Sequence, residues 1–132
     1  MLYTEADYGT FPIWHHEADL KMMDLQTKEN LNVDILNSSS VESYHSWSSN
    51  GRWIVFSSRR IDGLYTRLYL AYFDEKGNFH KPFLLPQSSA DFDLLRMQSY
   101  NIPEFTKGAT KISSREIEKL LKGGTSPSKL RK

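Results

Sequence analysis

The sequence predicts an all-β fold of antiparallel strands, and three observations support this prediction. Residues 31–36 alternate apolar and polar side chains with the period of two that marks a half-buried strand. The turn-forming pairs Asn50-Gly51 and Asp62-Gly63 separate runs of β-branched and aromatic residues. Aromatic residues make up 13% of the 132-residue chain although hydrophobic residues make up only 39%, which suits a β protein with an aromatic core.

Strand signals continue to residue 86. Residues 52–58 are β-branched and aromatic enough to be buried on both faces of a sheet. Pro82 indicates that the last strand lies at a sheet edge, because proline cannot donate to a ladder. We expect two strands, a loop and then four strands in up-and-down order, at residues 20–25, 31–36, 44–47, 52–58, 65–74 and 79–86.

Beyond Pro86 the pattern changes to short helices and extended segments. Residues 91–97 suit a short helix, and residues 113–122 suit a longer one that Ser113 and Glu116 begin with a capping box. The longer helix carries a short apolar stripe and ends at a glycine pair (Ile117, Leu120, Leu121; Gly123, Gly124). The expected parts are therefore a β region at 1–86, an extension with short helices at 87–124 and a disordered tail at 125–132.

Composition limits the chemistry that the chain can perform. The net charge of +1 gives no overall attraction to nucleic acid or to a membrane surface, and no apolar run is long enough to span a bilayer. Residues 104–132 hold eight Lys or Arg against three Glu, a local +5, which leaves −4 on residues 1–103. We interpret this basic end as solvated. Without cysteine the chain has no disulfide, no thiolate zinc site and no cysteine nucleophile.

The stretch from Trp47 to Asp74 resembles the repeat of TolB-type β-propellers. Those repeats run Trp-Ser-Pro-Asp-Gly, an apolar strand, an Asp-Gly loop and a second strand ending in Asp. Ser49 stands where the family usually has proline, and Asn50 stands where it usually has aspartate. The residues that match in order are Trp47, Ser48, Asn50, Gly51, Phe56, Ser58, Asp62, Gly63, Leu68, Tyr69 and Asp74.

This resemblance implies about one and a half antiparallel four-stranded propeller blades, a half blade at 17–36 and a full blade at 43–86. It also implies an exported, periplasmic protein similar to the C-terminal portion of TolB-like propellers of Bacteroidetes-type bacteria. Blades bury their faces against neighbouring blades. The chain is therefore expected to be a fragment of a longer protein, since it shows no signal peptide and starts in mid-pattern. The alternatives are self-association through exposed blade edges, or a C-terminal segment that covers the open face.

Two interpretations remain for the polar loop after residue 58. Arg59, Arg60, Asp62 and Tyr65 are the candidate partner-binding residues, since paired arginines at a rim can hold a carboxylate, a phosphate or a partner protein. Alternatively, the arginines form an ion pair with Asp62 or with a carboxylate of a neighbouring blade, and we favour this interpretation. The three tryptophans are expected to serve core or inter-blade packing (Trp14, Trp47, Trp53).

No catalytic residue, metal site or cofactor is predicted. Adjacent His15 and His16 point in opposite directions in a strand, so they, Glu17 and Asp19 do not provide the three or four ligands that a metal needs. The serines lack the Gly-x-Ser-x-Gly context of a nucleophile, and His45 is interpreted as structural. The expected function is a non-catalytic scaffold that binds a protein or peptide through the loops at 37–42 and 59–64. The alternative is a propeller fragment of an enzyme, or of a ligand- or metal-binding protein, whose site other blades complete.

Overall fold

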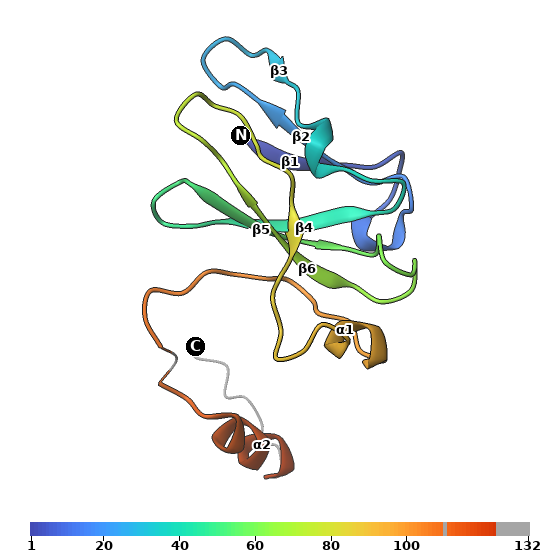
Figure 1. Cartoon of the computed structure of the whole chain (residues 1–132), viewed down its shortest axis with the longest axis vertical. Helices are drawn as coiled ribbons and strands as arrows, with labels where there is room; N and C mark the ends of the chain where they lie inside the picture. The colour runs from blue at the N-terminus through green and yellow to red at the C-terminus, as the bar shows by residue number, and fades with distance from the viewer. Residues whose placement is uncertain (110, 124–132) are drawn as a thin grey trace, which may run out of the picture.

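Two antiparallel sheets make up most of the molecule in the computed structural model, which describes residues 1–109 and 111–123 (Figure 1). The first sheet has the strand order β1-β2-β3, with β1 at Leu2–Glu5, β2 at Asp19–Met23 and β3 at Asn30–Leu31. The second has the order β4-β5-β6-β7, at Glu42–Trp47, Trp53–Ser58, Arg67–Tyr72 and Phe83–Leu84. The predicted antiparallel β class is confirmed, and the two sheets do not close into a ring within the described ranges.

The four-stranded sheet has the predicted up-and-down order. The β4–β5 turn forms at Asn50-Gly51, where Gly51 has a φ of +66° and Asn50 Oδ1 accepts from the Arg52 N–H at 3.1 Å. Residues 54–58 of β5 are all buried, as predicted for a strand covered on both faces. The strand expected at 79–86 shrinks to the two residues of β7, which does lie at the sheet edge, and a single Phe73–Phe79 bridge.

The prediction of a strand over 31–36 is wrong for most of that range. Only Leu31 belongs to β3, and residues Asp34–Leu36 form a 3₁₀ helix, η2. Val33 and Leu36 are the buried residues, three positions apart, so a helical turn buries them where alternation would have buried Val33 and Ile35. The first sheet gains β1 instead, which pairs with β2 from Leu2–Met22 to Glu5–Asp19.

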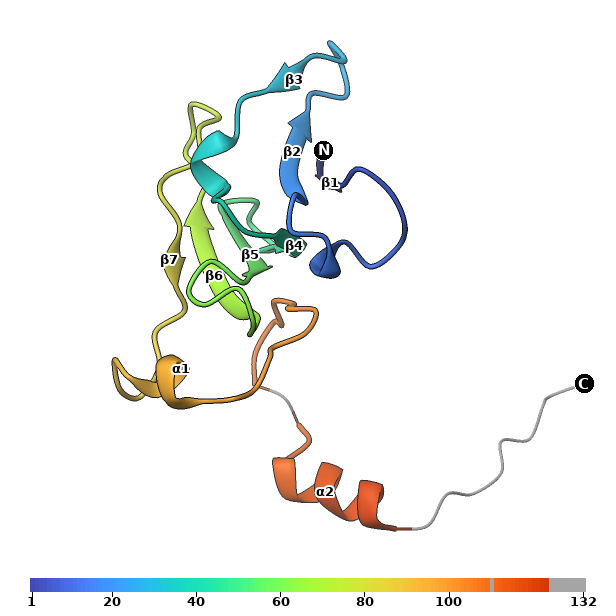
Figure 2. The same cartoon turned by 90° about the vertical axis from the view of Figure 1, so that its right-hand side faces the viewer.

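The main core lies between the two sheets, which pack face to face. Leu2 and Leu20 of the first sheet meet Ile54 and Phe56 of β5 in this core. Figures 1 and 2 show the first sheet, in blue, lying against the green β4–β6 sheet. Aromatic contacts extend the core towards β7, with Phe73 and Phe79 at a ring-centroid distance of 4.7 Å and Trp47 beside both.

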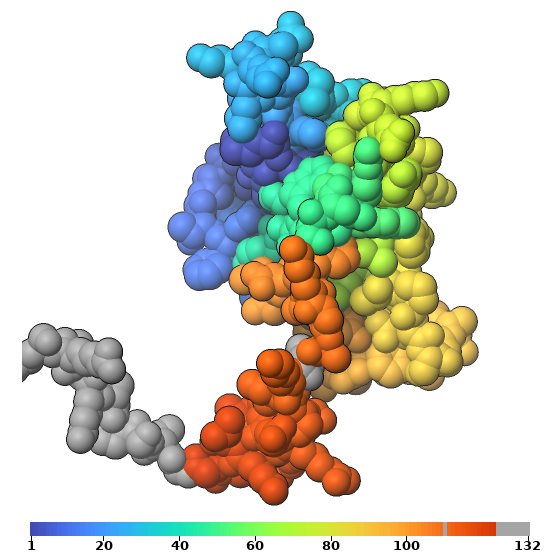
Figure 3. All heavy atoms as spheres, turned by 90° about the vertical axis from the view of Figure 1, so that its left-hand side faces the viewer, coloured from blue at the N-terminus to red at the C-terminus, as the bar shows by residue number. Residues whose placement is uncertain are grey.

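The C-terminal segment covers part of the opposite face of the four-stranded sheet. The Ser57 hydroxyl donates to the Asn101 carbonyl at 3.1 Å, and the Tyr100 N–H donates to the Thr66 carbonyl at 3.0 Å. Ser99 Oγ in turn accepts from the Thr66 N–H at 3.1 Å. Figure 3 shows this segment, in orange, lying across the green surface of the sheet. The sequence left three arrangements open for an exposed blade face: a longer protein, self-association, or a C-terminal segment that covers the face. The third arrangement is present for part of this face.

Arg67 fixes the start of the C-terminal segment to β6. Its side chain is 1% exposed, and its guanidinium donates to the carbonyls of Asp93 at 2.6 Å, Arg96 at 2.9 Å and Gln98 at 2.6 Å. The first of these carbonyls lies in the short helix α1, Phe92–Leu95. The carboxylates of Asp93 and Asp62 each lie 3.8 Å from the same guanidinium. A charged group from the sheet therefore satisfies three main-chain carbonyls of the extension.

The second helix, α2, spans Ser114–Lys122 and begins as predicted. Ser113 and Glu116 form a complete capping box, and hydrogen bonds from the Ser113 backbone and side chain lower the pKa of Glu116. Figure 2 shows α2 lying apart from the sheets, and its predicted apolar stripe stays exposed (Ile117, Leu120, Leu121). Across the ranges that the structure covers, no helix is long and apolar enough to cross a bilayer. The tail expected at 125–132 lies outside the described residues.

A bulge in β4 places His45 against the first sheet. The register of β4 on β5 shifts between Ser43 and Ser46, and Tyr44 adopts a φ of +49°. The His45 Nδ1 is buried without a hydrogen-bond partner in the described part of the chain. Burial lowers the pKa of His45, and a hydrogen bond to the Leu2 carbonyl opposes that effect only in part.

We therefore expect the free energy of unfolding to fall as the pH drops below about 6.5, the ordinary imidazole pKa. His45 takes up its proton at a higher pH in the unfolded chain than in the folded chain. The stability that the neutral imidazole contributes is therefore complete above pH 6.5 and is lost as the pH falls towards the pKa of the folded state. Denaturant unfolding at pH 7.5, 6.5 and 5.5 measures this loss. His45→Gln should flatten the profile and exposed His16→Gln should not. An equal slope in wild type and His45→Gln would contradict the assignment.

Candidate functional site

A cleft of about 450 Å³ opens where the β1–β2 loop, β4, the loop after β5 and the C-terminal segment meet. Its walls come from four separate stretches of sequence, and hydrogen bonds between Thr66 and residues 99–100 fix two of them together. Most lining side chains are apolar or aromatic, with hydroxyl and amide groups on one wall. The lining residues are Phe11, Ile13, Trp14, Tyr44, Arg59, Thr66, Ser99, Tyr100, Asn101 and Ile102.

A 3₁₀ turn, η1 at Pro12–Trp14, presents Trp14 to solvent. Phe11 has a φ of +57°, and its carbonyl accepts from the Trp14 N–H at 3.0 Å. Ile13 points inward and packs with Ala18 and Val41, which anchors the turn. Trp14 is 73% exposed as a result. Of the two roles expected for Trp14, core or inter-blade packing, core packing is wrong, because the tight turn buries the neighbouring Ile13 and turns the indole outward.

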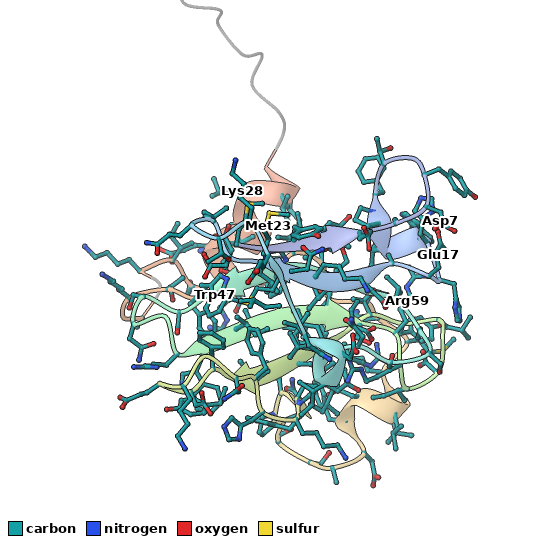
Figure 4. All side chains as sticks on the ribbon, turned by 90° about the horizontal axis from the view of Figure 1, so that it is seen from above. Asp7, Glu17, Met23, Lys28, Trp47 and Arg59 are labelled. Atoms are coloured by element: carbon teal, nitrogen blue, oxygen red, sulfur yellow. The ribbon has the colours of Figure 1, made fainter. Side chains whose placement is uncertain are left out.

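Arg59 lies over the Trp14 ring, with its guanidinium carbon 4.6 Å from the ring centroid. Its main chain is fixed at both ends, since its N–H donates to the Val41 carbonyl and its carbonyl accepts from Gly63 at 2.8 Å. Its Nε is buried and has no hydrogen-bond partner among the residues that the structure describes. Figure 4 shows Arg59 at the same end of the sheets as Asp7 and Glu17, away from Trp47. The cleft wall thus holds a positioned cation whose Nε is shielded from solvent.

The side chain of the adjacent Arg60 makes its contacts inside the protein. Its guanidinium donates to Glu42 Oε1 at 2.9 Å and to the Leu36 carbonyl at 2.6 Å, and it lies 4.5 Å from the Tyr69 ring centroid. Glu42 is fully buried, and its carboxylate also accepts from both Ser38 and Ser58. The sequence favours an ion pair of these arginines with Asp62 or with a carboxylate of a neighbouring blade. The carboxylate that pairs with Arg60 is Glu42, however, and not Asp62.

Asp62 and Tyr65 shape the loop and contact Arg67, and they do not line the cleft. Asp62 Oδ1 accepts from the N–H groups of Leu64 and Tyr65, both at 2.8 Å. Burial acts to raise the pKa of Asp62, but these two hydrogen bonds and the charge of Arg67 outweigh it, so the pKa lies below its ordinary value. The Tyr65 ring stacks on Arg67 at 5.3 Å. Of the four predicted partner-binding residues, the structure places only Arg59 in the cleft.

The acidic and histidine cluster beside the cleft forms a local pair. His15 Nδ1 lies 3.4 Å from Glu17 Oε1, and the Tyr8 ring meets the His15 ring edge-on at 4.8 Å. A hydrogen bond from its own backbone N–H, followed by the charge of His15, lowers the pKa of Glu17. His16 is exposed and points elsewhere, and within the described ranges no three His, Asp or Glu side chains gather closely enough to hold a metal ion.

No family model, curated protein or solved structure matches the chain. Function is therefore argued from the geometry of the cleft. Sequence reasoning missed Trp14, Tyr100 and Ile102 as cleft residues. The one local signal for Trp14 was its place directly after Pro12 and Ile13, in a proline-initiated turn that exposes the third residue. Tyr100 and Ile102 reach the cleft only through long-range contacts, for which the sequence carries no local signal.

Proposed function

We propose that the chain is a non-catalytic binding module that captures a protein or peptide partner in the Trp14–Arg59 cleft. The observation that carries the proposal is the stacked pair itself, an exposed indole beneath a half-buried guanidinium that pairs with no carboxylate of the described residues. Tryptophan, tyrosine and arginine are the residues that supply most binding energy in protein interfaces. All three types line this cleft.

The dimensions and rigidity of the cleft suit one or two side chains of a partner. Its volume of about 450 Å³ lies in the range of pockets that enclose small ligands or anchor residues. The buried Ile13 cluster holds one wall, and the Thr66 hydrogen bonds hold another. A site held in place by the fold loses little conformational entropy on binding.

The proposal includes kinship with TolB-like propellers and an exported, periplasmic setting. Three features support this kinship: the up-and-down order of β4 to β7, the Asn50-Gly51 turn and the face-to-face packing of a second sheet. In a propeller, loops at one rim commonly carry the binding residues. The loops that hold Trp14 and Arg59 meet at one end of the two sheets (Figure 4).

Selection of peptides from a random phage-displayed library tests the function. Peptides selected on the wild-type chain are expected to bind Trp14→Ala and Arg59→Gln at least about tenfold more weakly, a loss of about 1.4 kcal/mol for one anchor residue. The matched control is Arg52→Gln, which removes a half-buried arginine paired with the exposed Glu75. Calorimetry measures the affinities. Selected peptides that bind all four chains equally, or no selected peptide at all, would refute the cleft as the binding site.

A further inference from the structure

The cleft is electrostatically one-sided. Arg59 is the one charged residue in its lining, and no carboxylate lines it within the described chain. The Arg59 guanidinium is only half-buried and has no counter-ion in this lining, so its positive charge favours an anionic partner group in this position. Glu17, which lies at the same end of the sheets (Figure 4), has its Oε1 3.4 Å from His15 Nδ1.

Arg59 differs from the other arginines of the sheets in having no carboxylate partner. Arg52 lies 3.3 Å from Glu75, Arg60 lies 2.9 Å from Glu42, and Arg67 lies 3.8 Å from both Asp62 and Asp93. No carboxylate oxygen of the described residues comes within 4.0 Å of the Arg59 guanidinium, which rests on Trp14 instead. Stacking on an indole fixes the plane of the guanidinium, and the two terminal nitrogens, unlike the buried Nε, stay open to a planar acceptor.

We propose that the partner of this module presents an aspartate or glutamate side chain to Arg59, next to an apolar side chain that packs on Trp14 and Ile102. This inference rests on the proposed function and names the chemistry that the cleft selects. A carboxylate matches the planar fork of an arginine in two parallel hydrogen bonds. The exposed rings and aliphatic groups of the cleft then bury the neighbouring apolar residue.

The carboxylate is assigned to a side chain within a peptide segment and not to a chain terminus. Capture of a terminal carboxylate commonly uses successive free backbone N–H groups. In this wall the Thr66 N–H already donates to Ser99 and the Tyr100 N–H already donates to Thr66. A dianionic phosphate would also face the net −4 of residues 1–103 with a single arginine to hold it.

Three synthetic peptides test the inference on the full chain. The first is acetyl-Gly-Phe-Glu-Leu-Gly-amide, the second replaces Glu by Gln, and the third is the Gln peptide with a free C-terminal carboxylate. NMR titration follows the indole N–H of Trp14 and the Nε–H of Arg59. We expect the Glu peptide to shift both signals and to bind at least tenfold more tightly than the Gln peptide. That preference should weaken with added salt and vanish in Arg59→Gln.

The outcomes separate this inference from the proposed function. Equal binding of the Glu and Gln peptides would overturn the carboxylate assignment and leave a peptide-binding cleft in place. Tighter binding of the free-carboxylate peptide than of the Glu peptide would overturn the side-chain assignment alone. If neither these peptides nor any library peptide shifts the Trp14 and Arg59 signals, both the inference and the proposed function are refuted.

Discussion

Arg67→Ala is expected to lower the free energy of unfolding by about 3–5 kcal/mol, the loss typical when one member of a buried charge network is removed. The side chain is 1% exposed and donates to the carbonyls of Asp93, Arg96 and Gln98. Its loss leaves those carbonyls without a donor and the buried Asp93 carboxylate without its nearby cation, and it creates a cavity. Chemical denaturation followed by tryptophan fluorescence measures the change.

Two further variants make the Arg67 prediction specific. Arg52→Ala removes an arginine whose ion pair with Glu75 is solvent-exposed, so it should cost less than about 1 kcal/mol. Arg67→Lys keeps the charge but loses the planar fork, and we expect most of the destabilisation to remain. If Arg67→Ala and Arg52→Ala proved equally mild, the idea that Arg67 holds the C-terminal segment in place would be wrong.

Glu42→Ala is expected to cost about 3 kcal/mol or more, because it removes a fully buried carboxylate and leaves the half-buried Arg60 guanidinium without its ion-pair partner. The Glu42 carboxylate is 0% exposed and accepts from Ser38, Ser58 and Arg60. Without it, two hydroxyl groups and the Arg60 guanidinium lose their acceptor between the sheets. Thermal and denaturant unfolding of the variant, compared with wild type at pH 7, provide the measurement.

A double-mutant cycle apportions this second effect. Glu42→Ala together with Arg60→Ala should cost clearly less than the sum of the two single changes, because the double variant leaves no unpaired charge. Glu75→Ala is the matched surface control and should stay within about 1 kcal/mol of wild type. Strict additivity of the Glu42 and Arg60 changes would show that the two side chains act independently, contrary to their 2.9 Å contact.

Elements with a local cause were predictable from sequence. The Asn50-Gly51 turn needs a positive φ that glycine supplies, and the dense β-branched run of β5 needs burial on both faces. The start of α2 follows from the Ser113–Glu116 spacing alone. Each of these features depends on residues within one turn or one strand, so the sequence alone was sufficient to predict them.

Elements with a distant cause were not predictable in this way. Residues 31–36 alternate as a strand would, yet the Asn37 side chain hydrogen-bonds the N–H and the carbonyl of Leu20, and the chain before it turns into η2. Arg67 looks like a surface residue of an alternating strand until its contacts with residues 93–98 are known. The loop position made both Arg59 and Arg60 candidates. That only Arg59 is left for a partner follows from the long-range contact of Arg60 with Glu42, which the local sequence does not show.

The strap formed by residues 99–101 also determines the direction in which this architecture can be extended. It is hydrogen-bonded to Ser57 and Thr66 across one side of the four-stranded sheet, while the β1–β3 layer occupies the other. A further sheet packed on the strap side of the four-stranded sheet would have to displace residues 99–101. A sheet packed on the outer face of β1–β3 would leave the hydrogen bonds of those residues intact. Tandem copies or engineered fusions are therefore best joined on the β1–β3 side, because residues 99–101 already cover part of the opposite side.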